Sequence, residues 1–160
     1  MADEMKTTSV MTAEALLEHW QGHRRLTRRT IEAFPDEKLF SYSVEGMRSF
    51  GEMVCELLRM TIPIASGLIT GKWEELNVEK PITKVEILSQ WEDQTKQLDE
   101  IFPSIPAHKF GEVSTAFGQW NMPGINMVLY GIDNEIHHRG QGFVYLRSLG
   151  IEPPPFWERK

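Results

Sequence analysis

The sequence contains a single cysteine, Cys55, among its 160 residues. One thiol cannot form an intrachain disulfide, which argues against a disulfide-stabilised secreted domain and favours a reducing compartment. Cys55 lies in the segment GEMVCELL. We interpret it as a half-buried packing thiol rather than a nucleophile.

The sequence also has no run that approaches the ~18 apolar residues of a membrane span. Its N-terminal segment, residues 1–17, is acidic and lacks the apolar core of a signal peptide. The net charge of -6 argues against a basic face for nucleic acid. We interpret the one arginine cluster, RRLTRR at residues 24–29, as a solvated helix face. We therefore expect a cytoplasmic protein with no nucleic-acid and no membrane partner.

No segment alternates apolar and polar residues between turn signals, so strands are not expected. Apolar residues instead recur at helical spacing in four segments. We predict helices over residues 12–34, 49–69, 83–102 and 122–149. Thr12, Ser49 and Thr83 are the expected N-caps. Pro63 is expected to kink or tighten the second helix, because it has no amide to bond to Arg59.

Four amphipathic helices in one chain of this length predict an all-α fold, a four-helix bundle with long crossover connections. We expect a single domain over residues 1–160. The connections at residues 35–48 and 103–121 are unusually long. Connections of that length are expected to cross the bundle or to cover a site.

The last predicted helix has two roughly opposite faces, and we expect both of them to be covered rather than exposed to solvent. At ~100° per residue, one face carries Ile125, Leu129, Ile132, Ile136 and Phe143. The other face carries Met127, Gly131, Asn134, His138, Gly142 and Tyr145. We expect the bundle to cover one face and a site or a second subunit to cover the other. The sequence therefore predicts a homodimer.

The segment DNEIHHRGQG, residues 133–142, carries the densest chemistry of the chain. Asn134 and His138 lie one turn apart, a spacing that a metal ion can bridge, although an amide is a poor ligand. Glu135 and His138 form the Glu-x-x-His pair of di-iron bundles, but the sequence has no second such pair. His19 and His23 form a lone i, i+4 pair, for which structural roles are the simpler interpretation. For His138, a structural and a functional role both stay open.

The motif HHRGQ, followed by VYLRSLGIEPP, resembles the DinB-like family of four-helix bundles, the damage-inducible metalloenzymes. The segment AFPDEKLFSYSVEGMRSFGEMVCELL is similar to that family's first connection and the start of its second helix. The resemblance implies a zinc or nickel ion held by three histidines, one on the second helix and two on the last. In this sequence those positions are Glu56, Asn134 and His138, of which only the last is a histidine.

The resemblance therefore implies a variant metal site. Glu56 can bind zinc or nickel through its carboxylate, but Asn134 offers only a neutral amide oxygen. One implied function is a metal-dependent transferase or hydrolase of a small molecule, with an open coordination position that activates water or a thiol. The alternative is a non-catalytic dimeric ligand-binding bundle that has lost its metal. Candidates for contacts with the metal ligands or a substrate, or else for structural packing, are His137, His23, Tyr130 and Tyr145.

Overall fold

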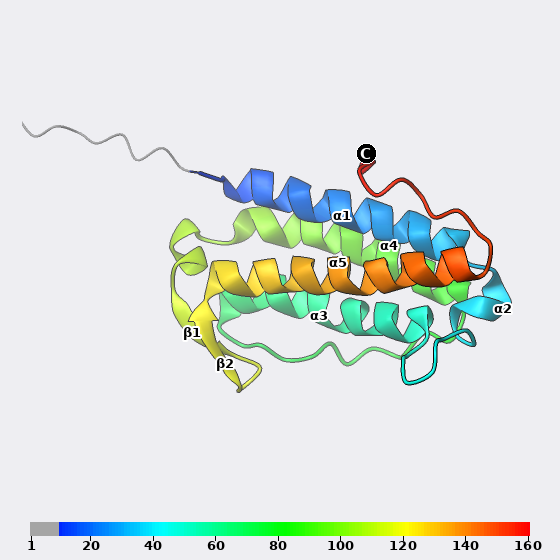
Figure 1. Ribbon diagram of the computed structural model, residues 1–160. Coiled ribbons are helices and arrows are strands. Elements are labelled where there is room, and N and C mark those ends of the chain that lie inside the picture. Colours follow the sequence, from blue (N-terminus) through cyan, green and yellow to red (C-terminus); the bar gives the residue numbers. More distant parts are fainter. Residues whose placement is uncertain (1–9) are drawn as a thin grey trace, which may run out of the picture.

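The computed structural model describes residues 10–160. Residues 1–9 lie outside the described residues, and they include the start of the N-terminal segment that is not expected to be a signal peptide. Within residues 10–160, four long helices lie side by side (Figure 1). They are α1 (Ala13–Ala33), α3 (Phe50–Thr70), α4 (Lys84–Ile101) and α5 (Gly124–Ser148). Short helices in the connections are α2 (Asp36–Leu39), η1 (Phe102–Ser104) and η2 (Ala107–Phe110). The predicted all-α bundle is confirmed.

Local capping chemistry fixes where two of these helices begin. The Ser49 hydroxyl accepts a hydrogen bond from the Glu52 amide, and the Glu52 carboxylate accepts one from the Ser49 amide. Thr83 and Glu86 form the same capping box at the start of α4. Each box satisfies two amides that a helix N-terminus would otherwise leave unpaired. Gly71, in the left-handed region with φ 71°, ends α3.

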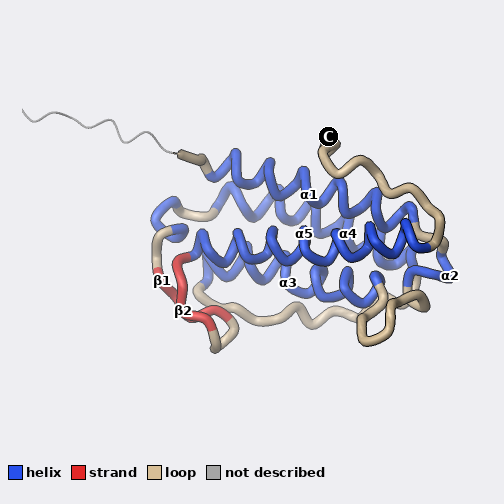
Figure 2. The backbone as a smooth tube through the Cα atoms, in the orientation of Figure 1, coloured by secondary structure: helices blue, strands red, loops and turns tan. Residues whose placement is uncertain are grey.

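The connection that crosses the bundle is neither of the two long ones from which this was expected, residues 35–48 and 103–121. The segments before α3 and before α5 turn at the ends of the bundle, whereas residues 71–83 run back along its whole length (Figure 2). Consequently α3 and α4 run in the same direction. α3 packs against both α4 and α5, and α1 packs against the same two helices.

A short hairpin precedes α5 and was not predicted. Strand β1 (Val113–Ala116) pairs antiparallel with β2 (Trp120–Pro123). The turn between them places Phe117 at φ 52° and Gly118 at φ 67°. A positive φ is rare for a bulky side chain, so Phe-Gly is not a turn signal that a sequence reveals. The strands are also too short for alternation to be recognised.

The core consists of two apolar clusters with a polar layer between them. The first cluster includes Trp20, Ile64, Leu98, Phe102 and Met127. The second includes Phe34, Phe50, Leu58, Trp91 and Tyr145. Between the clusters along the four long helices lie the buried polar residues Arg24, Thr27, Thr61, Gln94, Glu135 and Arg139. Buried polar groups are stable only when paired, so this layer constrains how the helices align.

Arg24 corrects the interpretation of the arginine cluster as a solvated face, because its side chain is fully buried. It donates hydrogen bonds to the Trp91 carbonyl at 3.0 Å and to Thr61 Oγ1 at 3.2 Å. Its guanidinium also lies 4.1 Å from the centroid of the Trp91 ring. Burial lowers its pKa from 12.5 to about 10, so it stays charged at neutral pH. The other arginines of the cluster pair at the surface: Arg25 with Glu18, Arg28 with Glu32, and Arg29 with Glu158.

Pro63 does not interrupt α3, which continues to Thr70. Its missing amide frees the carbonyl oxygen of Arg59, and this oxygen accepts a hydrogen bond from the Leu76 amide at 3.4 Å. The proline thus creates an attachment point for the crossover connection on α3. By length and composition, with a mean hydropathy of 1.4, α3 reaches what a membrane span requires, although the sequence showed no such run. However, 67% of that apolar stretch is buried, as expected for the central helix of a bundle.

Candidate functional site

The structure brings together Glu56, Asn134 and His138, the three residues that the resemblance assigns to the metal position. Glu56 comes from the second turn of α3, and the other two lie one turn apart on α5. Glu56 Oε1 lies 3.1 Å from both Asn134 Nδ2 and His138 Nε2. The three side chains therefore meet around one carboxylate oxygen.

The second oxygen of Glu56 is also occupied. Arg48, in the segment before α3, donates a hydrogen bond to Glu56 Oε2 at 2.6 Å. Burial of the Glu56 carboxyl raises its pKa, but the hydrogen bonds from Arg48, Asn134 and His138 outweigh burial and lower the pKa from 4.5 to about 2. Glu56 is therefore a carboxylate at neutral pH, with both oxygens engaged by protein donors.

This environment determines which nitrogen of His138 carries a proton. Burial lowers the pKa of His138, and the contact with Glu56 opposes this shift only in part, so the ring is neutral at pH 7. Because an ionised carboxylate can only accept, His138 Nε2 carries the proton and donates it to Glu56. His138 Nδ1 then presents a lone pair, and it is buried with no hydrogen-bond partner within residues 10–160.

This donor set does not match a tightly held zinc or nickel ion. A metal bound at His138 Nε2 would move the proton to Nδ1, which has no acceptor in the described part of the chain. Asn134 presents its amide nitrogen to Glu56, so its oxygen points elsewhere. Arg48 places a positive charge on the remaining carboxylate oxygen. Residues 10–160 also contain no group of three or more His, Cys, Asp or Glu side chains arranged to hold a metal.

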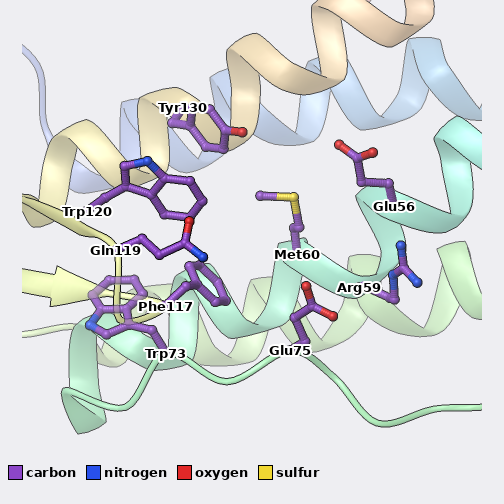
Figure 3. A pocket seen from close by; sticks show the side chains of 9 residues that line it. All are labelled: Glu56, Arg59, Met60, Trp73, Glu75, Phe117, Gln119, Trp120 and Tyr130. Carbon is purple, nitrogen blue, oxygen red and sulfur yellow. The ribbon is translucent and has the colours of Figure 1, made fainter.

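A cavity of about 530 Å³ lies beside this cluster, and Glu56 lines it (Figure 3). Its walls come from α3, the crossover connection, the hairpin and the first turns of α5. The lining residues are Glu56, Arg59, Met60, Trp73, Glu75, Phe117, Gln119, Trp120 and Tyr130. A volume of this size is typical of small-molecule sites. The hairpin segment thus forms part of the cavity wall.

The remaining candidate residues have different locations. Tyr130 lines the cavity. Tyr145 is fully buried, and its hydroxyl donates to the Arg48 carbonyl at 2.9 Å, which makes it a support for the Arg48 segment. His137 is exposed, and its Nε2 lies 2.9 Å from the side-chain nitrogen of Gln141. Neither His137 nor Tyr145 lines the cavity beside Glu56.

His23 contacts the polar layer, through Arg139, and does not line the cavity. Its two ring nitrogens each lie 2.9 Å from a guanidinium nitrogen, Nδ1 from Arg139 and Nε2 from Arg159. A neutral imidazole has one acceptor nitrogen, so only one of the two contacts is a hydrogen bond. Burial, reinforced by the nearby positive charges, lowers the pKa of His23 from 6.5 to about 3. A group held neutral between two arginines is a poor partner for a cation.

The sequence did not predict the buried polar contacts that Glu135 and Arg139 of α5 make with α1. Glu135 is buried, and its carboxylate accepts a hydrogen bond from Thr27 at 2.6 Å. Arg139, one turn later, lies 3.9 Å from the same oxygen and donates to Thr27 at 3.0 Å. The i, i+4 spacing of Glu135 and Arg139 was the available signal, but charged pairs at that spacing are more often on the surface.

Comparisons with known proteins agree with this fold. The chain is 21% identical over 148 residues to the uncharacterized protein YjoA of Bacillus subtilis (strain 168), covering 91% of this chain and 96% of that protein. The crystal structure of that DinB-like protein superposes with a TM-score of 0.75, covering 91% of this chain and 98% of the other. A DinB-like protein from Bacillus cereus ATCC 10987 is 22% identical, covers 89% and 95% of the two chains, and gives a TM-score of 0.73. The model of the DinB family matches residues 4–160, and the chain therefore belongs to the DinB family.

Proposed function

We propose that this protein is a ligand-binding bundle that takes a small molecule into the cavity beside Glu56 and works without a resident metal ion. The observation that carries the proposal is the state of the Glu56 carboxylate. Both of its oxygens already accept hydrogen bonds from Arg48, Asn134 and His138. A metal would have to displace these donors, whereas an organic ligand can enter the neighbouring cavity and leave them in place.

The hydrogen-bonded cluster then acts as the rigid end of the cavity. Arg48, Glu56 and His138 connect the segment before α3, α3 itself and α5. Glu56 is the one of the three that also lines the cavity. Charge-assisted hydrogen bonds of this kind are among the stronger polar interactions in proteins. In this proposal the cluster holds the cavity in shape before a ligand arrives.

The second candidate is a metal-dependent transferase or hydrolase acting on a small molecule. One observation favours it: the neutral imidazole of His138 and the ionised carboxylate of Glu56 meet at 3.1 Å, and both are ligand types that zinc and nickel accept. This candidate requires Asn134 to turn its amide oxygen inward and Arg48 to withdraw.

Metal content distinguishes the two candidates. The protein is purified without a polyhistidine tag, and zinc and nickel are measured in the wild type and in Glu56→Ala and His138→Ala. We expect far less than one metal per chain, and no rise in melting temperature when either metal is added. A stoichiometric metal that disappears in both variants would instead establish the metal-dependent candidate.

A further inference from the structure

Aromatic rings form one side of the cavity beside Glu56. Four of its nine lining residues are aromatic, whereas aromatic residues make up 10% of the chain. The rings form a continuous series in which neighbouring centroids are 6.3 Å apart, from Trp73 to Phe117, Trp120 and Tyr130. Trp120 and Tyr130 each remain 42% exposed. Exposed rings that share one cavity wall are typical of a surface on which a flat apolar group stacks.

Charged groups lie on the other side of the cavity, across from the rings (Figure 3). The Glu56 carboxylate already accepts hydrogen bonds from Arg48, Asn134 and His138. Arg59 and Glu75 differ from it. Within residues 10–160, neither the Arg59 nor the Glu75 side chain has a salt-bridge partner or a hydrogen bond. Arg59 is held by α3, and the hydrogen bond between the Leu76 amide and the Arg59 carbonyl holds the neighbouring Glu75 close to it.

We propose that the cavity takes a small zwitterion, a molecule with an ammonium group, a carboxylate and an apolar body, as an α-amino acid with an aromatic side chain has. This rests on the proposed ligand-binding function and names its ligand class. The ligand carboxylate meets Arg59, whose guanidinium matches a carboxylate in a two-pronged hydrogen bond. The ligand ammonium meets Glu75, and the apolar body lies on Trp120 and Tyr130.

The presence of both charges selects a zwitterion over a simple ion. A ligand with only an ammonium group would pair with Glu75 but would place a second positive charge near Arg59. A ligand with only a carboxylate would place a second negative charge near Glu75, with Glu56 on the same wall. Like charges brought together in this way lower affinity, so each single-charged analogue binds more weakly.

Four probes with the same ring test the inference: L-phenylalanine, 2-phenylethylamine, 3-phenylpropanoate and the neutral 2-phenylethanol. Each is titrated into the isotope-labelled full chain, and the shift of the Trp120 indole N–H is followed by NMR. We expect L-phenylalanine to bind at least about tenfold more tightly than either charged analogue. Equal affinity of L-phenylalanine and the neutral alcohol would overturn the zwitterion but leave the proposed ligand-binding function standing. If none of the four probes perturbs Trp120, both proposals fail.

Two charge variants assign each end of the ligand. Arg59→Gln should weaken L-phenylalanine and 3-phenylpropanoate by about tenfold and should strengthen the amine, because the like charge that opposed its ammonium is gone. Glu75→Gln should weaken L-phenylalanine and the amine and, for the same reason, should strengthen the acid. Lys72→Gln and Glu74→Gln are matched controls, because both residues are exposed in the crossover connection and neither lines the cavity. All four positions are exposed, so folding should be kept, and an unchanged melting temperature verifies this. A loss of affinity as large in the controls as in the lining variants would contradict the assignment.

Discussion

Arg48 and His138 bind opposite oxygens of the same Glu56 carboxylate, Arg48 at 2.6 Å from Oε2 and His138 at 3.1 Å from Oε1. Arg48 comes from a connection and His138 from α5, so one carboxylate joins three segments that are far apart in sequence. The resemblance to the DinB-like family assigns the position of Glu56 to a metal ligand. In this protein Glu56 is the centre of a hydrogen-bond cluster. Its chemistry therefore depends on a residue, Arg48, that is not part of the metal motif.

Replacing Arg48 should make the cluster a better metal site. In Arg48→Gln the Glu56 carboxylate loses its strongest donor and the nearby positive charge, so its pKa should rise from about 2 towards 4.5. A carboxylate oxygen also becomes available, and zinc affinity should increase by about tenfold. Isothermal titration with zinc measures the change. Arg28→Gln, which removes a surface ion pair with Glu32, is the control. Identical zinc affinity in Arg48→Gln and the wild type would contradict this account of Glu56.

Acid should destabilise the protein through His23. The folded-state pKa of His23, about 3, lies below its ordinary value of 6.5, because burial and the charges of Arg139, His19 and Arg159 disfavour the imidazolium. The unfolded chain therefore binds a proton first, and stability is lost as the pH falls from about 6.5 towards 3. His138, whose pKa is also lowered by burial, acts in the same direction.

The measurement is the melting temperature between pH 7.5 and 4. We expect a fall on the order of 5 °C or more in the wild type. His23→Gln keeps an acceptor for Arg139 but cannot titrate, so its melting temperature should fall less over the same range. Parallel pH profiles for the two proteins would show that His23 is not the group responsible.

The helices were predictable because their boundaries are set by nearby residues. Ser49 with Glu52 and Thr83 with Glu86 place the starts of α3 and α4 within one residue of the predicted positions. Gly150, at φ 76°, follows the end of α5, where a glycine commonly ends a helix. The hairpin was not predictable, because Phe117 adopts a positive φ that its residue type disfavours. Tertiary contacts must hold that turn.

The proximity of Glu56, Asn134 and His138 was predictable, but the hydrogen-bond cluster that they form was not. The resemblance placed Glu56, Asn134 and His138 at equivalent positions, and the structure brings them together. Nothing in the sequence links Arg48 to Glu56, because an arginine in a connection can point anywhere until the helices pack. Arg24 is a similar case: its burial depends on partners in α3 and α4, and single-sequence periodicity does not reveal them.

Pro63 should control how firmly the crossover connection is attached. Pro63→Ala restores an amide that can bond to the Arg59 carbonyl, which then competes with the Leu76 amide for the same oxygen. We expect the Leu76 amide to exchange hydrogen at least about tenfold faster, since this exchange reports local opening. Affinity for cavity ligands should fall as well, because Trp73 and Glu75 precede this attachment point. Unchanged exchange at Leu76 would show that other contacts hold the connection.

The outer face of α5 provides the remaining prediction, that the protein is a homodimer. The face with Met127, Gly131 and His138 is buried in the bundle, but the opposite face leaves Leu129 40% and Ile136 38% exposed. Val144, further along α5, is 61% exposed. Apolar side chains gathered on one helix are suited to cover the same helix of a second copy. Sedimentation at micromolar concentration should give a dimer, and Ile136→Glu should convert it to a monomer. As the control, Val85→Glu places the same charge on α4, where Val85 is 73% exposed, and should stay dimeric. A wild-type protein that sediments only as a monomer would remove the prediction.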